Sequence, residues 1–233
     1  MSRKKILILV AGGHGTRMGG LIPKQFLTLL GKAVLQWTME RFISACPGIK
    51  VITVLPEEHF KTWRDYCTTH NFHYPQVLVP GGITRFHSVR AALEKVPDGA
   101  IVAVHDGVRP LVSEDLLARM FSKMDTERAL IPVLPSTDTL KLLDRERGTG
   151  RLVQSPEALD RSRVYAAQTP QMFRSEDLKE AYRQPYDTLF TDDASVAQGI
   201  NIPLSFIEGE RFNLKITTKE DLVLAEAILR SSS

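Results

Sequence analysis

The sequence contains little that would indicate a secreted or membrane-spanning protein. Its 233 residues include only two cysteines, Cys46 and Cys67, which lack the C-x-x-C spacing of a redox or zinc motif. No run of 18 apolar residues is present, so we expect no membrane-spanning helix. The N-terminus lacks the apolar stretch and the cleavage site of a signal peptide, and a reduced, cytoplasmic protein is therefore expected.

Two further kinds of site find little support in the composition. The formal net charge is only +3, and no basic run is longer than Arg3-Lys4-Lys5, so we do not expect a nucleic-acid surface. The six histidines form no H-x-x-x-H or H-E-x-x-H pattern. A zinc centre is therefore not expected either.

Short runs of Val, Ile and Leu alternate with amphipathic stretches, which is typical of βαβ units on a parallel sheet. We expect one α/β domain with a Rossmann-like, mostly parallel sheet flanked by helices. The expected strands are Lys5–Val10, Lys50–Leu55, Gln76–Pro80, Ala100–His105 and Ala129–Leu134. The expected helices are Val34–Ala45, Pro56–Tyr66, Ser88–Val96, Ser113–Met124 and Thr217–Leu229, the last begun by a capping box between Thr217 and Glu220.

Residues 137–163 interrupt this alternation. Two short extended segments there flank a charged turn that contains Gly148 and Gly150, a pattern typical of a β-hairpin. Such a hairpin has little apolar surface to pack on its own domain. We therefore expect a protruding arm that embraces a second subunit, with a mobile surface ribbon as the alternative.

The strongest functional pattern is A-G-G-H-G-T-R at residues 11–17, directly after the first expected strand. Three glycines in four positions allow a tight turn and let several backbone N–H groups approach one anion. This loop is expected to bind phosphate, since ligands of open α/β sheets lie beyond the carboxyl ends of strands. Counting excludes G-x-G-x-x-G, because Met18 replaces its last glycine, and the Walker pattern, because Leu21 follows Gly20.

Two cations accompany the glycine loop. Arg17 lies within it, and Lys24 follows Pro23 seven residues later. Positive charge beside bound phosphates stabilises the charge that develops on a pentavalent phosphorus and on departing pyrophosphate. Arg17 and Lys24 are therefore expected to stabilise the transition state, and each alone could equally be a solvated surface charge.

Three later segments place polar side chains near expected strand ends. Asp106 could hold a hydroxyl or a divalent metal there, or cap its own turn. Gly82 and Ser88 offer close backbone approach and a hydroxyl, or a plain turn with a helix N-cap. Lys215, at the end of a strand expected over residues 213–215, could reach a substrate phosphate or be exposed.

A series of sequence motifs, taken in their order along the chain, resembles the 2-C-methyl-D-erythritol 4-phosphate cytidylyltransferase family from Lys5 to about Leu229. They are A-G-G-x-G-T-R-M with P-K-Q-F, G-G-x-x-R-x-x-S-V, V-H-D-x-x-R-P, D-T-L-K, Q-T-P-Q-M-F, T-D-D-A-S-V and N-L-K-I-T-T-x-E-D-L. The resemblance implies cytidylyl transfer from CTP to 2-C-methyl-D-erythritol 4-phosphate in non-mevalonate isoprenoid biosynthesis. It also implies Mg²⁺ on the triphosphate, a single nucleotidyltransferase domain over residues 1–233, and a homodimer joined by the arm.

The resemblance assigns roles to individual residues. The nucleotide-binding set is Ala11, Gly12, Gly13, Gly15, Thr16, Gly82, Ser88 and Asp106. The catalytic set is Arg17, Lys24, Arg161 and Lys215, and the acceptor-binding set is Asp106, Arg109, Thr139, Thr169 and Thr191. Thr139 and Arg161 are expected to serve the neighbouring subunit, and Asp106 is the one candidate protein ligand for the metal. Ile83 replaces an acidic residue common in relatives, so a contact by that side chain is in doubt.

Two alternative functions stay open at this stage. Ribitol 5-phosphate cytidylyltransferase resembles the family in the glycine loop and in N-x-K-I-T-T, although Lys141 and the T-D-D-A-S run favour the methylerythritol enzyme. The other alternative is a nucleotide-binding regulator that has lost turnover. Retention of Arg17, Lys24, Asp106 and Lys215 argues against the regulator, because a silent site has no need of all four.

Overall fold

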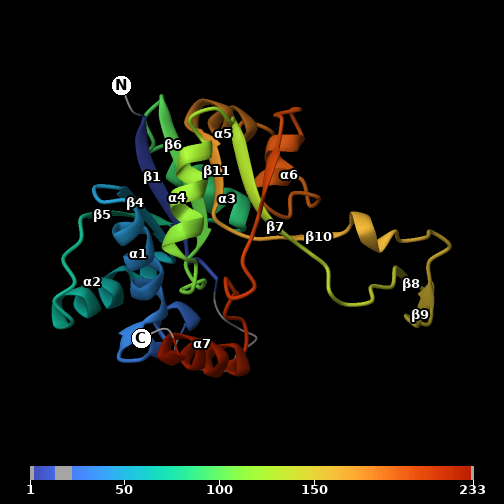
Figure 1. The fold of residues 1–233 in the computed structure, drawn as a ribbon, viewed down its shortest axis with the longest axis horizontal. Coiled ribbons are helices and arrows are strands. Elements are labelled where there is room, and N and C mark those ends of the chain that lie inside the picture. The colour runs from blue at the N-terminus through green and yellow to red at the C-terminus, as the bar shows by residue number, and fades with distance from the viewer. Residues whose placement is uncertain (1–2, 14–22, 232–233) are drawn as a thin grey trace.

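The computed structural model describes residues 3–13 and 23–231, and its centre is one large sheet (Figure 1). Its eight strands have the order β10-β7-β11-β6-β1-β4-β5, and β12 pairs with β7. One direction is shared by β1 (Lys4–Val10), β4 (Lys50–Leu55), β5 (Gln76–Pro80), β6 (Ala100–Asp106), β7 (Ala129–Pro135) and β12 (Ser205–Glu208). The opposite direction is taken by β10 (Tyr165–Ala167) and β11 (Gln171–Arg174). The mostly parallel sheet and all five expected strands are therefore confirmed.

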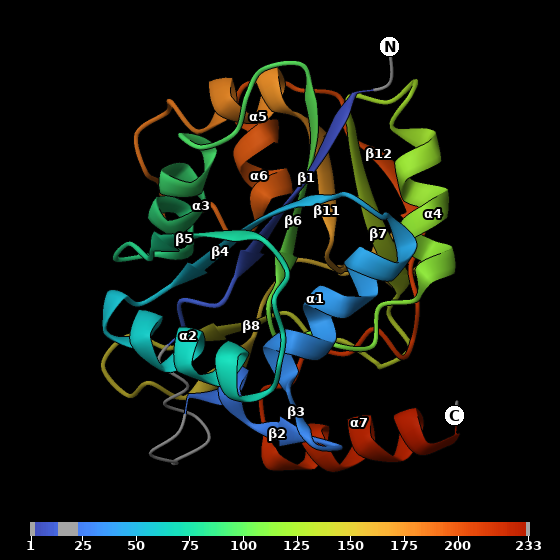
Figure 2. The same cartoon turned by 90° about the vertical axis from the view of Figure 1, so that its left-hand side faces the viewer.

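Helices cover both faces of this sheet (Figure 2). One face carries α1 (Val34–Ala45), α2 (Phe60–Thr69) and α4 (Glu114–Lys123), and the other carries α3 (Arg85–Leu93), α5 (Ser175–Ala181) and α6 (Asp193–Gln198). The strand period of two explains the division, because Leu7 and Leu9 of β1 pack on the first group whereas Ile6 and Ile8 pack on the second. Among the described residues, no helix combines the length and the apolar character that crossing a membrane requires.

A third, smaller cluster lies below the sheet, where α7 (Lys219–Ser231) packs under the β1 and β6 ends (Figures 1 and 2). Its members include Leu29 of the short strand β2, Val34 at the start of α1, Val108 from the loop after β6, and Leu229 of α7. The same region holds η2 (Lys24–Phe26) and the short ribbon β2 (Thr28–Leu29) with β3 (Lys32–Ala33). This cluster anchors the segments that surround the candidate site.

Three helix starts differ from expectation, and hydrogen bonds explain the starts of α3 and α7. The helix α3 begins at Arg85, because the Thr84 hydroxyl accepts from the N–H of His87, and Ser88 lies inside the helix. The box that begins α7 joins Thr218 to Asp221, one residue later than predicted. The helix expected over 56–66 divides into a 3-10 turn, η3 (Glu57–His59), followed by α2.

The prediction of a strand over residues 213–215 is wrong. This segment has no strand pairing because its polar groups bond to loops: the Arg109 guanidinium donates to the Asn213 carbonyl at 2.7 Å, and the N–H of Ile216 donates to the Val108 carbonyl at 2.9 Å. Lys215 is therefore presented by an irregular segment that is held against the loop after β6. An isolated sequence pattern does not distinguish such a segment from a strand, because both are extended.

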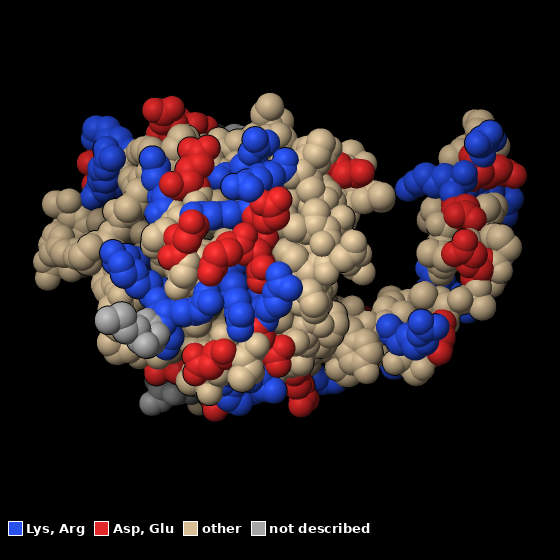
Figure 3. All heavy atoms as spheres, turned by 90° about the horizontal axis from the view of Figure 1, so that it is seen from above, with Lys and Arg blue, Asp and Glu red and all other residues tan. Residues whose placement is uncertain are grey.

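The predicted hairpin is present. It consists of β8 (Leu143–Arg145) and β9 (Leu152–Gln154), which pair antiparallel around a turn closed by the N–H of Gly150 and the Glu146 carbonyl at 3.0 Å. Figures 1 and 3 show it standing away from the body, and its tip carries both signs of charge. Apolar side chains along the arm are exposed, namely Leu140, Leu142, Leu143, Leu152, Val153 and Leu159.

Candidate active site

A cavity of about 310 Å³ lies at the carboxyl ends of β1 and β6. Five separate segments contribute to its wall, and eight of the residues expected at the site are among the lining residues: Ala11, Gly12, Gly13, Lys24, Gly82, Ser88, Asp106 and Lys215. Motifs more than 200 residues apart in the chain thus meet at one place. Gly15, Thr16 and Arg17 lie outside the described residues.

The start of the glycine loop is fixed from several sides. The N–H of Ala11 donates to the Val54 carbonyl, and the Ala11 carbonyl accepts from Nε2 of the buried Gln25, both at 2.9 Å. Gly107 lies against this turn so closely that an added Cβ would come within 2.9 Å of the Ala11 Cβ. The bond to Gln25 also places its neighbour Lys24 beside the loop.

The turn after β5 is built around Gly82. Its N–H donates to the Ser88 hydroxyl at 3.0 Å, and that hydroxyl donates to the Thr84 carbonyl at 3.0 Å. A Cβ on Gly82 would come within 2.4 Å of the His87 Cβ, so no larger residue fits without a shift. Ser88 therefore supports the turn from below, while Ile83, 96% exposed, stands at the cavity rim.

Asp106, the last residue of β6, is surrounded by cations. Its Oδ2 atom lies 3.0 Å from Lys215 Nζ and 3.1 Å from Arg109 Nε, and its Oδ1 atom lies 3.9 Å from Arg85 Nε. Burial alone would raise the pKa of this carboxyl group, but the three cations outweigh burial and hold the pKa well below its usual range. Asp106 is consequently a fixed negative charge that organises positive ones.

Arg85 lines the cavity, and the sequence patterns assigned no role to it. Its Nη2 atom donates to Oδ2 of the fully buried Asp193 at 2.6 Å, and the hydroxyl of Tyr182 donates to Oδ1 at 2.6 Å. Burial would lower the pKa of Arg85, but the charge of Asp193 raises it above its usual value. Both residues lie in sequence motifs, Arg85 in G-G-x-x-R and Asp193 in T-D-D. Neither motif indicates that the two side chains form a pair.

Thr169 and His105 lie behind Asp106. The Thr169 hydroxyl is 3.1 Å from the backbone nitrogen of Asp106 and 2.9 Å from His105 Nδ1, and both side chains are buried. Burial lowers the pKa of His105 to about 3. The expected acceptor-binding residue Thr169 is thus occupied by contacts inside the protein.

Three other expected residues are not brought to this cavity within one subunit. Thr139 and Arg161 belong to the arm, where the Arg161 guanidinium donates to the Thr137 carbonyl at 2.6 Å. Thr191 is exposed before α6, whose N-terminus is closed by a reciprocal capping box between Asp192 and Ser195. Arg109 does not line the cavity itself, but it forms an ion pair with Asp106, which does.

The described residues offer few ligands for a metal. No group of three His, Cys, Asp or Glu side chains that could hold an ion is found in the described part of the chain. Asp106 is the one carboxylate among the described cavity-lining residues, and two cations already bind its Oδ2 atom.

Comparisons with known proteins agree with this arrangement. The model of the family described as 2-C-methyl-D-erythritol 4-phosphate cytidylyltransferase matches residues 5–231. A relative of that name from Porphyromonas gingivalis is 44% identical, covering 99% of this chain and 100% of its own length. Another, from Bacteroides fragilis, is 42% identical over 95% of this chain and 98% of its own.

Solved structures show the same similarity. The 2-C-methyl-D-erythritol 4-phosphate cytidylyltransferase of Thermus thermophilus is 33% identical, with a TM-score of 0.71 over 98% of this chain and 99% of its own. The 4-diphosphocytidyl-2C-methyl-D-erythritol synthase of Anaerococcus prevotii is 25% identical, with a TM-score of 0.79 over 99% and 100%. Neither the ribitol enzyme nor a silent regulator is favoured by these matches. The chain therefore belongs to the 2-C-methyl-D-erythritol 4-phosphate cytidylyltransferase family, the enzymes that transfer a cytidylyl group from CTP to that sugar phosphate in isoprenoid biosynthesis.

Proposed function

We propose that the cavity at the ends of β1 and β6 is where this chain binds CTP and methylerythritol phosphate. The supporting observation is that Lys24 and Lys215 line the same cavity as the glycines of two separate turns. In this cavity, an oxygen of the acceptor phosphate would attack the α-phosphorus of CTP in line, and pyrophosphate would leave. No protein nucleophile is required, because such transfers depend on positioning and on charge stabilisation.

Lys24 is proposed to stabilise the leaving pyrophosphate. It begins η2, and the bond from its neighbour Gln25 to the Ala11 carbonyl holds this short helix against the glycine loop. A cation so placed lies where negative charge increases in the transition state. Arg17 is proposed to share this role from the part of the loop outside the described residues.

Lys215 is proposed to bind the acceptor phosphate. Its side chain is 41% exposed, and its Nζ lies 3.0 Å from Asp106, which holds it at the cavity. A phosphate that enters can compete for this ammonium group, while Arg109 remains on the carboxylate. Asp106 is proposed to stay ionised throughout and to accept hydrogen bonds from the nucleotide or the acceptor. Thr191 is proposed as a further acceptor contact.

Mg²⁺ is the proposed cofactor. The triphosphate oxygens would supply its ligands, because Asp106 is already engaged by Lys215 and Arg109. When bound, the ion supplies Lewis-acid stabilisation of the phosphate charge. The residues of the chain bind and orient the nucleotide that carries it.

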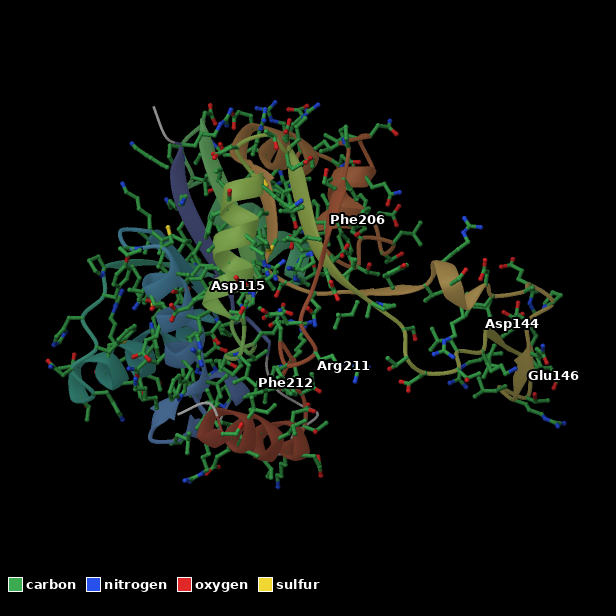
Figure 4. The ribbon with its side chains drawn as sticks, in the orientation of Figure 1. Asp115, Asp144, Glu146, Phe206, Arg211 and Phe212 are labelled. Atoms are coloured by element: carbon green, nitrogen blue, oxygen red, sulfur yellow. The ribbon has the colours of Figure 1, made fainter. Side chains whose placement is uncertain are left out.

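A homodimer is the proposed assembly, with residues 1–233 as one domain and residues 137–163 as the connecting arm. The arm exposes apolar side chains, and a groove of about 740 Å³ at its base is lined by Val133, Tyr165 and Phe206, among others. Figure 4 shows Phe206 on the body and Asp144 and Glu146 at the far end of the arm. We propose that the arm carries Thr139 and Arg161 to the cavity of the partner subunit.

Turnover with defined substrates tests the activity. Purified protein with CTP, Mg²⁺ and methylerythritol phosphate should release pyrophosphate and form the CDP-linked product. Lys24→Ala should abolish turnover while leaving the unfolding transition unchanged. Activity with ribitol 5-phosphate alone would contradict the assignment, and so would full turnover in the Lys24 variant.

A further inference from the structure

His105 is fully buried one residue before Asp106, yet both of its ring nitrogens are hydrogen-bonded. Nε2 lies 3.2 Å from the Arg109 carbonyl, and Nδ1 lies 2.9 Å from the Thr169 hydroxyl. The ring packs edge-on against Phe42, with centroids 4.9 Å apart. These contacts fix the orientation of the His105 ring. The proposed reaction assigns no role to this side chain.

The partners of His105 determine where its proton lies. The Arg109 carbonyl can only accept, so Nε2 must carry the hydrogen. The ring is neutral because burial lowers its pKa and outweighs the charge of Asp106, which raises it, while Arg109 and Lys215 lower it further. Nδ1 is therefore an acceptor, and the hydroxyl of Thr169 must donate to it.

The single hydroxyl proton of Thr169 is thus committed to His105. The oxygen of the same hydroxyl accepts from the backbone N–H of Asp106 at 3.1 Å. Such a hydroxyl has no proton left to donate to a substrate phosphate or hydroxyl. With a neutral ring, hydrogen bonds are donated in order from Asp106 N–H to Thr169, from Thr169 to His105, and from His105 to the Arg109 carbonyl.

The chain of bonds closes through Asn213. Its side-chain Nδ2 donates to the Thr169 backbone carbonyl at 2.8 Å, and its backbone carbonyl accepts from Arg109 Nη1 at 2.7 Å. Arg109 in turn binds the Asp106 carboxylate, and Lys215 follows Asn213 by two residues. One buried ring of hydrogen bonds therefore places both the acid and the lysine of the cavity.

We propose that His105 and Thr169 are positioning residues of this reaction, which hold the Asp106–Arg109 turn so that Asp106 meets Arg109 and Lys215, and that Thr169 does not donate to the acceptor. This inference rests on the proposed role of Asp106. It replaces the acceptor contact expected for Thr169 with an indirect role. Both residues act from behind the cavity, because neither lines it among the described residues.

Nitrogen NMR tests the bond order without activity. In protein labelled with ¹⁵N-histidine, we expect His105 to be the Nε2–H tautomer, with an unprotonated Nδ1, between pH 6 and 8. Thr169→Val should shift the Nδ1 resonance, because it removes the donor, and Thr169→Ser should restore it. A protonated Nδ1, or a resonance that Thr169→Val leaves unchanged, would overturn the inference.

Kinetics separate positioning from substrate contact. Thr169→Val should lower kcat by up to about a hundredfold, the cost of a displacement of roughly 1 Å at a reacting centre. Thr169→Ser should recover most of the rate. Thr53→Val is the matched control, since Thr53 is equally buried but donates to Gln76 on the sheet. A higher acceptor KM at unchanged kcat would instead indicate a direct contact and contradict the proposal.

A double-mutant cycle shows whether Thr169 acts through Asp106. In the Asp106→Asn background, Thr169→Val should cost little further rate, because the group that it positions is already lost. Multiplicative losses would overturn the positioning role while leaving Asp106 in place. Wild-type turnover by Asp106→Asn alone would contradict the proposed function of Asp106, whereas the NMR measurement would still decide the bond order.

Discussion

Arg85 and Asp193 are 108 residues apart in the chain and are joined by a 2.6 Å bond between Nη2 and Oδ2. Arg85 begins α3, directly after the Gly82 turn, and Asp193 begins α6, directly after Thr191 and Asp192. The pair therefore fastens the turn proposed for the nucleotide to the segment proposed for the acceptor. Because Asp193 is fully buried, this connection is shielded from solvent.

Replacement of Asp193 by Asn should destabilise the protein. The change leaves the partly buried Arg85 with only the more distant Asp106 carboxylate, 3.9 Å away, and breaking a buried pair costs about 3 kcal/mol of unfolding free energy. Urea denaturation followed by circular dichroism measures the loss. Asp65→Asn is the control, because Asp65 forms an exposed pair with Lys61, worth at most about 1 kcal/mol. Equal, small losses in both variants would mean that the buried pair contributes no more than a surface one.

Lys215→Ala should reduce turnover by roughly a hundred- to a thousandfold, the usual cost of losing one group that stabilises developing charge. The KM for the acceptor should rise more than that for CTP, because Lys215 is assigned to the acceptor phosphate. Steady-state kinetics with each substrate varied in turn provide the test. Lys219→Ala, four residues later at the exposed start of α7, should behave as wild type. Unchanged acceptor binding in the Lys215 variant would refute its assignment.

Mixing two inactive variants tests the arm. If Arg161 serves the partner subunit, a dimer of one Lys24→Ala and one Arg161→Ala chain contains one complete site and one doubly damaged site. Random exchange at equal concentrations should therefore restore about a quarter of wild-type activity. The measurement is turnover before and after subunit exchange. Mixtures that stay inactive after verified exchange would place Arg161 in its own subunit or outside the reaction.

Acid should weaken the fold partly through Asp106. Its folded pKa lies below the ordinary value of 3.8, so the unfolded chain binds the proton more readily. The stabilisation is complete above about pH 5 and is lost as the pH falls through 3.8 towards the lower, folded pKa. Thermal melts between pH 2.5 and 6 should show a shallower pH dependence for Asp106→Asn than for wild type. Parallel curves would mean that the carboxylate gains nothing from its cations.

Regular elements could be predicted where local patterns suffice. The strands β4 and β5 have the predicted bounds because runs of Val, Ile and Leu between turn residues leave one interpretation. The start of α3 was misplaced because Thr84 and Ser88 are both suitable caps, and only the bond to His87 decides between them. The strand expected over residues 213–215 is absent because this segment is held instead by the loop after β6, more than 100 residues away, through the Arg109 guanidinium and the bond between Ile216 and Val108.

The residues of the candidate site also fall into those that could be predicted from local sequence patterns and those that could not. Gly82 and Asp106 could be found from their motifs, since glycine-rich turns and charges at strand ends are local features, and Lys215 lies at the cavity although the strand expected there is absent. The pairing of Arg85 with Asp193 and the hydrogen-bond ring behind Asp106 could not, because each joins residues from distant segments. Thr169 shows the limit most clearly, since its motif indicates a functional hydroxyl and only the fold reveals that His105 holds its proton.

The position of β1 between β4 and β6 has a consequence for how this enzyme can vary. The chain that leaves the carboxyl end of β1 leads to α1 on one face of the sheet, and the turn that leaves the carboxyl end of β5 leads to α3 on the other, so the crevice at these strand ends lies between the two. The loops that border this crevice are connected to helices on opposite faces of the sheet. Acceptor preference can therefore change in one loop without repacking the other face, provided that the link between Arg85 and Asp193 is kept.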